Sequence, residues 1–507
     1  MAGGKHRRLW IVIGFLAIAA IALGATAWFK FFREVPQQLA NDTPVERYKY
    51  GSIGIEENQG LPYWIWLVLP KMFPEYLPQP GGWASLGLAW EQGREMPVGF
   101  SKKTIGFDRV AITCAFCHTA RVRAPGQPVA RIFPAGPGNT VAPLAYQRFL
   151  FNAASDPRFT SDNVMAAIGE IVRLSPLDRT LYRLVLVPAV RRALIEQKQQ
   201  FEWTDHRPDW GRGRIDPFNP IKFRLLKSEL YGSRPISEVD DGTIGNSDMQ
   251  PIWNMRLRVQ RQMAFHWDGL NTDLKEVVLS SALGDGATPK SLPLADLQTL
   301  QDYLESLQPP RFEEMFPNGI NHQLASTGEP LYKEYCARCH AADGATTGKV
   351  LALTDNDWSE GVDPGAPRPR FTDGHRAAMW TPAAAKAYNT YSQRYKDKFA
   401  FSHFRSTGGY VSVPLDGVWI RAPYLHNGSV PYLGEVLEVP SRRTPVFYRG
   451  LDVYDPVRMG FVSEGPEAER GTKYDTSEMG NGNQGHLWGV QLTPEQKRAL
   501  VEYLKTL

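Results

Sequence analysis

Two short cysteine–histidine motifs hold the residues best suited to chemistry. Each has the spacing C-x-x-C-H, once as CAFCH at 114–118 and once as CARCH at 336–340. In such a motif each thiol can add to one vinyl group of a haem, and the adjacent imidazole binds the iron from the proximal side. The two motifs use all four cysteines of the chain, which predicts two covalently bound haem c groups. The residues concerned are Cys114, Cys117, Cys336 and Cys339 for attachment, with His118 and His340 as proximal ligands.

A zinc site and a pair of disulfides are the alternative uses of these cysteines. A zinc site would bring both cysteine pairs to one point, and it gives no reason for a histidine directly after each pair. Haem iron is therefore the favoured metal. The sequence offers no ligand cluster that would establish a calcium ion, so calcium is left open.

The sixth coordination position decides what each iron could do. Histidine or methionine in that position gives an electron carrier, whereas an open position admits peroxide or dioxygen. No histidine occurs in residues 119–205, and only His206 and His266 lie between His118 and the end of the first unit. We therefore expect an open first iron. His266 is the best candidate for a ligand there, with a structural histidine as the alternative.

Four histidines follow the second motif, and two of them stand out by their context. His426 lies within RAPYLHNGS (421–429), and His486 lies within GNGNQGHLWG (480–489), directly before the closing helix. Either of them could complete a six-coordinate iron opposite His340.

Composition places the chain among globular proteins. It has 507 residues, 43% of them hydrophobic and 22% charged, with a formal net charge of +4. This length suggests two to four domains. No block of lysine and arginine is interleaved with aromatic residues, so we expect no nucleic-acid partner.

The N-terminus is expected to hold the chain at a membrane. Basic residues at 5, 7 and 8 precede an apolar run over 9–29, long enough to cross roughly 30 Å of hydrocarbon as a helix. Aromatic residues flank the run at both ends, as at membrane interfaces. A cleaved signal peptide ending at Ala25-Thr26-Ala27 is the alternative. Haem is attached outside the cytoplasmic membrane, so we expect a single-pass anchor with the bulk of the chain on the periplasmic face, or a soluble periplasmic protein after cleavage.

The first half of the chain should contain several distinct segments. Residues 34–60 are polar and predict a tether. The aromatic stretch 61–77 contains prolines that forbid one continuous helix, and it should cover the first haem, with contact to the membrane surface as the alternative. Helical spacing of apolar residues predicts a hairpin over 161–200, interrupted near Pro176, and residues 203–255 should be irregular.

The helices that close the two halves look alike. The helix predicted over 293–307 contains LQDYLESL, and the chain ends in LVEYLKTL, with leucine and tyrosine at the same offsets. Thr493, Pro494 and Gln496 predict a capped start for the last helix. Another helix over 327–335 should lead into the second motif. Because each closing helix follows one haem motif, the pattern indicates a duplicated unit.

These elements predict a mainly α-helical protein with two cytochrome-c-like haem domains, long irregular insertions and an N-terminal transmembrane helix. The expected boundaries are an anchor at 1–33, a tether at 34–60, an N-terminal haem domain at 61–320 with a helical insertion, and a C-terminal haem domain at 321–507.

Taken together, the motifs resemble those of the bacterial di-haem cytochrome c peroxidase superfamily. The resemblance rests on the paired haem motifs, the RAPYLHNGS stretch and the GH-x-x-G turn at 485–489. Two further stretches, GRIDPFNP at 213–220 and HWDGLNTDLKEVVLSSALGDGATP at 266–289, are most similar to the branch of di-haem rubber oxygenases. The resemblance covers most of residues 50–507 and leaves the N-terminal helix outside.

This resemblance implies a division of labour between the haems. The N-terminal haem would react with peroxide or dioxygen, and the C-terminal haem would be a six-coordinate electron relay. Its distal ligand comes from the loop before the last helix, which favours His486 over His426. A tryptophan carries electrons between the haems, and Trp267 matches that position best, with core packing as its alternative role. Leu283 would lie near the distal side of the first haem.

One departure from the resemblance bears on the activity. Peroxidases that need reductive activation carry a distal histidine soon after the first motif, and residues 119–205 hold none. An always-open site, as in rubber oxygenases, is therefore favoured. An anchored enzyme is badly placed to attack a polymer particle, so rubber is not the expected substrate.

We therefore expect a di-haem c-type cytochrome oxidoreductase that uses peroxide or dioxygen at its N-terminal haem. Its partner would be a redox protein that donates or accepts electrons, or a small apolar substrate together with O2 or H2O2. The alternative is a non-catalytic, membrane-tethered electron carrier. In that carrier both irons are six-coordinate, and His266 is the best candidate ligand for the first iron.

Overall fold

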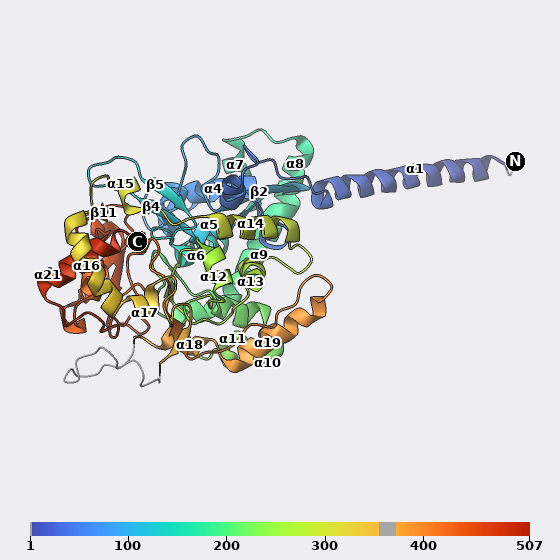
Figure 1. Cartoon of the computed structure of the whole chain (residues 1–507). Coiled ribbons are helices and arrows are strands. Elements are labelled where there is room, and N and C mark those ends of the chain that lie inside the picture. The colour runs from blue at the N-terminus through green and yellow to red at the C-terminus, as the bar shows by residue number, and fades with distance from the viewer. Residues whose placement is uncertain (1–2, 354–371) are drawn as a thin grey trace.

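The N-terminal helix α1 (Gly3–Ala27) stands apart from the body of the protein (Figure 1). The computed structural model describes residues 3–353 and 372–507. Among these, one helical stretch, Trp10–Phe32, is long and apolar enough to cross a membrane, and none of it is buried against the protein. Its length and composition fit a membrane anchor and a signal sequence equally well.

Residues 44–59 fold onto the body, although they fall within the segment expected to be a tether. Helix α2 (Pro44–Tyr50) begins with a Thr43 cap, and Tyr48 and Tyr50 on it are buried. The hydroxyl of Tyr48 donates to the carbonyl oxygen of His118. Burial of these aromatic side chains stabilises the position of the helix, so this part of the chain belongs to the first haem motif's surroundings.

A small antiparallel sheet leads into the first motif. Its strands are β1 (Leu61–Pro62), β2 (Phe100–Ile105) and β3 (Phe107–Ile112), in the order β1-β3-β2. The motif helix α5 (Cys114–Cys117) follows β3 directly and is capped by Thr113. Strands β4 (Thr119–Val122) and β5 (Arg131–Pro134) pair immediately afterwards. Paired strands on both sides therefore fix the motif in place.

The aromatic segment 61–77 is largely packed into the core, and its role in covering the first haem stays a prediction, since only Leu61 of this segment lines the cavity. Helix α4 (Tyr63–Met72) buries Trp66 completely, and the Trp66 ring stacks on Trp83 with centroids 4.7 Å apart. The alternative of a second membrane contact is wrong for this helix, because its large side chains face the interior.

The other predicted helices are present with the expected breaks. The 161–200 hairpin forms as α7 (Ser161–Gly169), α8 (Pro176–Leu181), the π-helical turn η4 (Tyr182–Leu186) and α9 (Val187–Gln200). The remaining helices of the first half are α3 (Glu56–Gln59), α6 (Pro143–Ser155), α10 (Lys227–Tyr231), α11 (Ile236–Val239), α12 (Met255–Gln260), α13 (Leu274–Asp285), α14 (Leu294–Ser306) and α15 (Phe312–Met315).

The second half surrounds two packed helices. Helix α16 (His322–Tyr335) lies against the last helix, α21 (Pro494–Leu504), whose predicted capping box from Thr493 and Gln496 is present. The remaining helices are α17 (Ala337–His340), α18 (His375–Met379), α19 (Pro382–Ser392) and α20 (Leu433–Val436). The remaining strands are β6 (Arg214–Ile215), β7 (Ser247–Asp248), β8 (Val350–Ala352), β9 (Gly409–Val411), β10 (Val446–Arg449), β11 (Tyr454–Asp455), β12 (Gly460–Phe461) and β13 (Thr472–Asp475).

Matching tyrosine pairs support an internal duplication. Tyr303 on α14 packs against Tyr48 with ring centroids 5.6 Å apart, and Tyr503 on α21 packs against Tyr332 at 5.1 Å. In each half, the tyrosine of the closing helix therefore meets a tyrosine on a helix that precedes the haem motif.

The predicted boundary at 320/321 does not separate the two cores. The stretch 377–404 from the second half, which includes α19, packs into the first core, where the hydroxyl of Tyr388 donates to the carbonyl of Ser280. In exchange, Ala120, Val122 and Trp253 belong to the second core. The two halves are therefore interleaved, because apolar side chains from each complete the core of the other.

Candidate haem sites

The first motif opens onto a cavity of about 370 Å³. Cys114, Cys117 and His118 all line it, and most of its wall is apolar. Such a concave, largely apolar site with a few polar groups suits a planar hydrophobic cofactor. Its wall includes Phe116, Tyr146, Leu150, Met249, Phe265 and Leu304.

His118 is held in the tautomer that an axial ligand needs. Its Nδ1 lies 2.7 Å from the carbonyl oxygen of Gln250, and because a carbonyl only accepts, Nδ1 must donate. Nε2 is then left unprotonated for a metal. Burial lowers the pKa of His118, and the bond to Gln250 opposes that shift, so the ring is neutral.

All four cysteines are free thiols. No disulfide joins them, which overturns the disulfide alternative. Burial raises the pKa of Cys114, Cys117 and Cys336, so these three thiols are protonated and uncharged. Burial raises the pKa of Cys114 to about 12, with the Asp285 charge adding to it, and burial raises the pKa of Cys336 to about 12. Zinc binds thiolates, and no group of three or more His, Cys, Asp or Glu among the described residues could hold a metal ion. The zinc alternative therefore has no support.

The second motif repeats the histidine arrangement and adds a facing histidine. His340 Nδ1 lies 2.7 Å from the carbonyl oxygen of Val413, which again frees Nε2. The ring of His486 faces that of His340 with centroids 6.2 Å apart. With metal–nitrogen bonds of about 2.0 Å, two imidazoles on opposite sides of one metal have ring centres roughly 6.3 Å apart. The two residues fit a six-coordinate haem iron.

The backbone of His486 is held in an unusual conformation. Its φ is +49°, in the left-handed region that non-glycine residues seldom adopt and that clusters at functional sites. Its carbonyl accepts a hydrogen bond of 3.1 Å from Arg443. Burial, together with His340 and Arg443, lowers the pKa of the ring to about 3, so it is neutral and able to bind a metal.

His426, the other candidate, lies elsewhere. Its ring stacks on Tyr410 with centroids 4.1 Å apart, and its carbonyl accepts a 2.8 Å hydrogen bond from the amide of Asp248. Within the described residues its ring forms no contact with His340. His426 therefore sits where the two halves of the chain meet.

His266 lines the first cavity, but it does not face His118 as His486 faces His340. Its ring contacts Phe218 at 5.0 Å, and no ring pair between His118 and another histidine occurs in the part of the chain that the structure describes. Its Nε2 is buried without a hydrogen-bond partner among the described residues, and burial, with Arg376 and His118, lowers its pKa to about 3. His266 also has a positive φ of +66°.

Trp267 forms hydrogen bonds with both of the backbone segments that bind His118 and His340. Its Nε1 donates to the carbonyl of Asp248 at 2.7 Å, two residues before the Gln250 carbonyl that binds His118. Its own carbonyl accepts from the amide of Val411 at 2.8 Å, two residues before the Val413 carbonyl that binds His340. A continuous series of covalent and hydrogen bonds thus runs between the two imidazoles through Trp267.

The carboxyl of Asp285 lines the cavity but was not predicted as a site residue from the sequence. Asp285 is the last residue of α13, and its carboxyl forms no hydrogen bond with the described residues. Burial raises its pKa to about 7, although Arg224 opposes the shift. Two other carboxylates lie outside the cavity: Glu170 pairs with Lys71 at the surface, and Glu276 binds Asn271. Asp285 falls within the stretch 266–289 that carries the resemblance, but its burial in the cavity wall depends on the fold and could not be predicted from its neighbours in sequence.

Leu283 does not occupy its expected place. It is fully buried on α13 but is not among the residues that line the cavity, whereas Ser280, Ser281 and Asp285 of the same helix are. Leu274, Val277, Val278 and Gly284 line it as well, so the side of α13 that faces the cavity is a mixture of apolar and polar groups.

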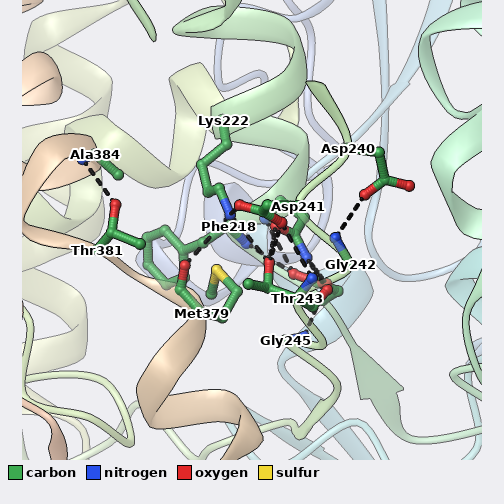
Figure 2. A network of polar contacts seen from close by, with 12 residues as sticks. Phe218, Lys222, Asp240, Asp241, Gly242, Thr243, Gly245, Met379, Thr381 and Ala384 are labelled. Atoms are coloured by element: carbon green, nitrogen blue, oxygen red, sulfur yellow. Dashed lines mark hydrogen bonds and ion pairs between the residues drawn. The ribbon is translucent and has the colours of Figure 1, made fainter. Parts of the chain in front are cut away.

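A polar network fixes another part of the cavity wall. The buried ammonium of Lys222 donates to Asp241 at 2.5 Å, to Thr243 at 3.0 Å and to the Met379 carbonyl at 3.4 Å. Figure 2 shows these groups converging from the two halves of the chain. Since Phe218 and its neighbours on the same turn line the cavity, the network holds the wall against the 377–404 stretch.

Asp268 and Arg376 form a buried ion pair beside His266. The pair spans 2.8 Å, and its side chains are 3% and 2% exposed. We expect Asp268→Asn to lower the free energy of unfolding by about 3–5 kcal/mol, because a buried guanidinium loses its counter-charge. Denaturant unfolding of the holoprotein measures this change. Glu329→Gln, which breaks the exposed pair with Lys333, is the control and should cost less than about 1 kcal/mol; equal effects would contradict the prediction.

Comparison with known proteins agrees with a haem protein. Residues 409–448 match the family described as RoxA-like, cytochrome c-like. The segment includes Val411, Val413 and His426, so it covers part of the Trp267 connection. Two relatives come from Sinorhizobium fredii: uncharacterized protein y4iJ is 27% identical over 473 residues, covering 78% of this chain and 77% of the relative, and uncharacterized protein y4iM is 27% identical over 286 residues, covering 51% and 64%. The match supports a rubber-oxygenase-like cytochrome that carries haem c.

Proposed function

We propose that this protein is a di-haem c-type cytochrome oxidoreductase with two unequal centres. Cys114, Cys117 and His118 hold one haem at the cavity, and Cys336, Cys339, His340 and His486 hold the other. Haem bound at the cavity would supply redox chemistry toward peroxide or dioxygen. The C-terminal centre would exchange electrons with it through Trp267, and with a redox partner or an apolar substrate.

The observation that carries this proposal is the difference between the two histidine sites. His340 has an imidazole facing it with ring centroids 6.2 Å apart, whereas no histidine ring faces His118 within the described residues. A closed centre suits electron relay and an open one suits small-molecule chemistry. The largely apolar cavity wall would shield a haem bound there from water.

Asp285 is the side chain best placed to move a proton in the cavity. Asp216 and Asp248, the other carboxyls of the wall, are engaged: Asp216 accepts from Asn219 and from Gly245, and Asp248 pairs with Arg449. Asp285 keeps its carboxyl oxygens available, and a pKa near 7 suits a group that both takes up and returns a proton.

The role of Asp285 predicts a pH dependence. Asp285 is mostly protonated at pH 6 and mostly ionised at pH 8, so the rate of reaction with peroxide should rise about tenfold across that interval if the carboxylate accepts the peroxide proton. Asp285→Asn should remove this rise and slow the reaction by about 100-fold at pH 8. Stopped-flow rates from pH 5.5 to 8.5 measure both. A wild-type profile that is flat, or one that the variant retains, would exclude Asp285 as the base.

A non-catalytic electron carrier is the second candidate, and one observation favours it. The buried Nε2 of His266 lacks a partner among the described residues and lies on the wall of the cavity. If this nitrogen bound the first iron, both centres would be six-coordinate.

Absorption and EPR spectra of the oxidised protein distinguish the two functions. The proposed enzyme should show one low-spin haem and one high-spin haem that binds cyanide. Two low-spin haems that do not respond to cyanide or peroxide would establish the carrier instead. The variant His266→Ala separates the cases further, because it should create a cyanide-binding haem only in a carrier.

A further inference from the structure

Exposed aliphatic side chains form a stripe on the 161–200 hairpin. Leu177, Leu184 and Val185 are 46%, 68% and 42% exposed. Leu177 and Leu184 are seven residues apart, which places them on one face of continuous α8–η4, two helical turns apart. Tyr182 and Leu186 on the opposite face are buried in the core. The stripe is therefore an apolar surface beyond what the core requires.

This stripe lies beside the point where the N-terminal helix leaves the body (Figure 1). Lys30, just beyond α1, forms a 2.6 Å ion pair with Asp178 on α8, which ties the two elements together. Trp28 and Phe29, next to Lys30, are about half exposed, and such aromatic residues favour the membrane–water interface.

The charges around the stripe suit a phospholipid surface. Arg173, Arg179 and Arg192 are exposed on the same hairpin. Of the acidic groups on this hairpin, Asp178, Glu170 and Asp162 pair with Lys30, Lys71 and Arg183, and Glu196 is exposed on α9. An apolar stripe flanked by arginines is the composition of helices that lie in the membrane interface, where each basic residue is attracted by anionic lipid.

We infer that the α8–η4 stripe rests on the bilayer surface, against anionic phospholipid, while α1 crosses the same membrane. The body is then held at two places and cannot turn freely about its anchor. One face of α9 (Val190, Ala193, Leu194) lines the haem cavity, so this attachment would bring the cavity wall close to the lipid. The inference concerns the surface alone and does not depend on which reaction the haems perform.

Photo-crosslinking of the full chain in nanodiscs tests this attachment. Leu184→p-benzoylphenylalanine should form lipid adducts at a yield about tenfold above that of Val457→p-benzoylphenylalanine. Val457 is 79% exposed and follows β11, which lies on the far side of the body from α1 (Figure 1), so it is a matched control. Mass spectrometry counts the adducts, and absorption spectra confirm that both variants carry haem.

Charge substitutions give a second, independent reading. The double variant Arg173→Glu, Arg179→Glu should lower the adduct yield at position 184 several-fold in phosphatidylglycerol nanodiscs and little in phosphatidylcholine. Equal yields at 184 and 457 would overturn the inference. A covalent dimer formed from position 184 would overturn it in favour of contact with a second copy of the chain. A mature protein that lacks the N-terminal helix would also overturn it, because the inference requires α1 to cross the membrane.

Discussion

His486→Ala is expected to turn the C-terminal iron into a cyanide-binding centre and to shift its reduction potential by on the order of 100 mV. The expectation follows from the facing rings of His340 and His486, 6.2 Å apart between centroids. The left-handed backbone at position 486 holds the imidazole in place, and no other histidine ring faces His340 within the described residues. EPR and a potentiometric titration measure the two changes.

His426→Ala is the matched control for this substitution. His426 is also buried and also has a depressed pKa of about 3, caused chiefly by burial. Since its ring stacks on Tyr410 and not on His340, the variant should keep both low-spin and high-spin signals and lose only stability. If His426→Ala opened the C-terminal iron and His486→Ala left it closed, the axial ligand would have to be reassigned to His426.

Trp267→Phe is expected to slow electron exchange between the two haems on the order of tenfold, which corresponds to about 1.4 kcal/mol of barrier. Phenylalanine keeps the ring in the wall but removes the Nε1 donor, which breaks the 2.7 Å link to the Asp248 carbonyl. It also replaces an oxidisable indole by a ring that resists oxidation. Stopped-flow reduction of the C-terminal haem, followed by re-equilibration at the first haem, measures the rate.

Trp253→Phe provides the comparison for Trp267. Trp253 is fully buried and donates to the carbonyl of Asp416 at 3.3 Å, but it is not part of the connection between His118 and His340. This variant should exchange electrons at the normal rate. An unchanged rate in Trp267→Phe, with both haem spectra intact, would show that electrons take another route.

The parts of the fold that the sequence predicted are those set by local rules. The capping box at Thr493 and the break near Pro176 are properties of a few neighbouring residues, so they could be read from the chain directly. The placement of His486 before the last helix was also available from the sequence. Its ring faces that of His340 in the folded chain, while its role as the iron ligand, which the resemblance implied, stays a prediction.

Features that depend on long-range packing could not be predicted in this way. The aromatic segment 61–77 and the stripe at 177–185 are both apolar, and hydrophobicity alone does not tell which of them faces solvent. Asp285 acquires its raised pKa from elements far away in the chain. The exchange of core residues between the halves, and the packing of 44–59 onto the first half, result from contacts that sequence periodicity does not encode.

The interleaving of the two cores would fix the separation of the two proposed haems. Because the 377–404 stretch completes the core around the first motif while Ala120 and Val122 complete the other, the two haem motifs belong to one interleaved body. Tunnelling between the haems would then occur across a fixed gap, so its rate should depend on driving force and not on solvent viscosity. If the polypeptide were cut between its two haem-binding motifs and the fragments separated, each fragment would lack side chains that complete its hydrophobic core and would expose apolar surface.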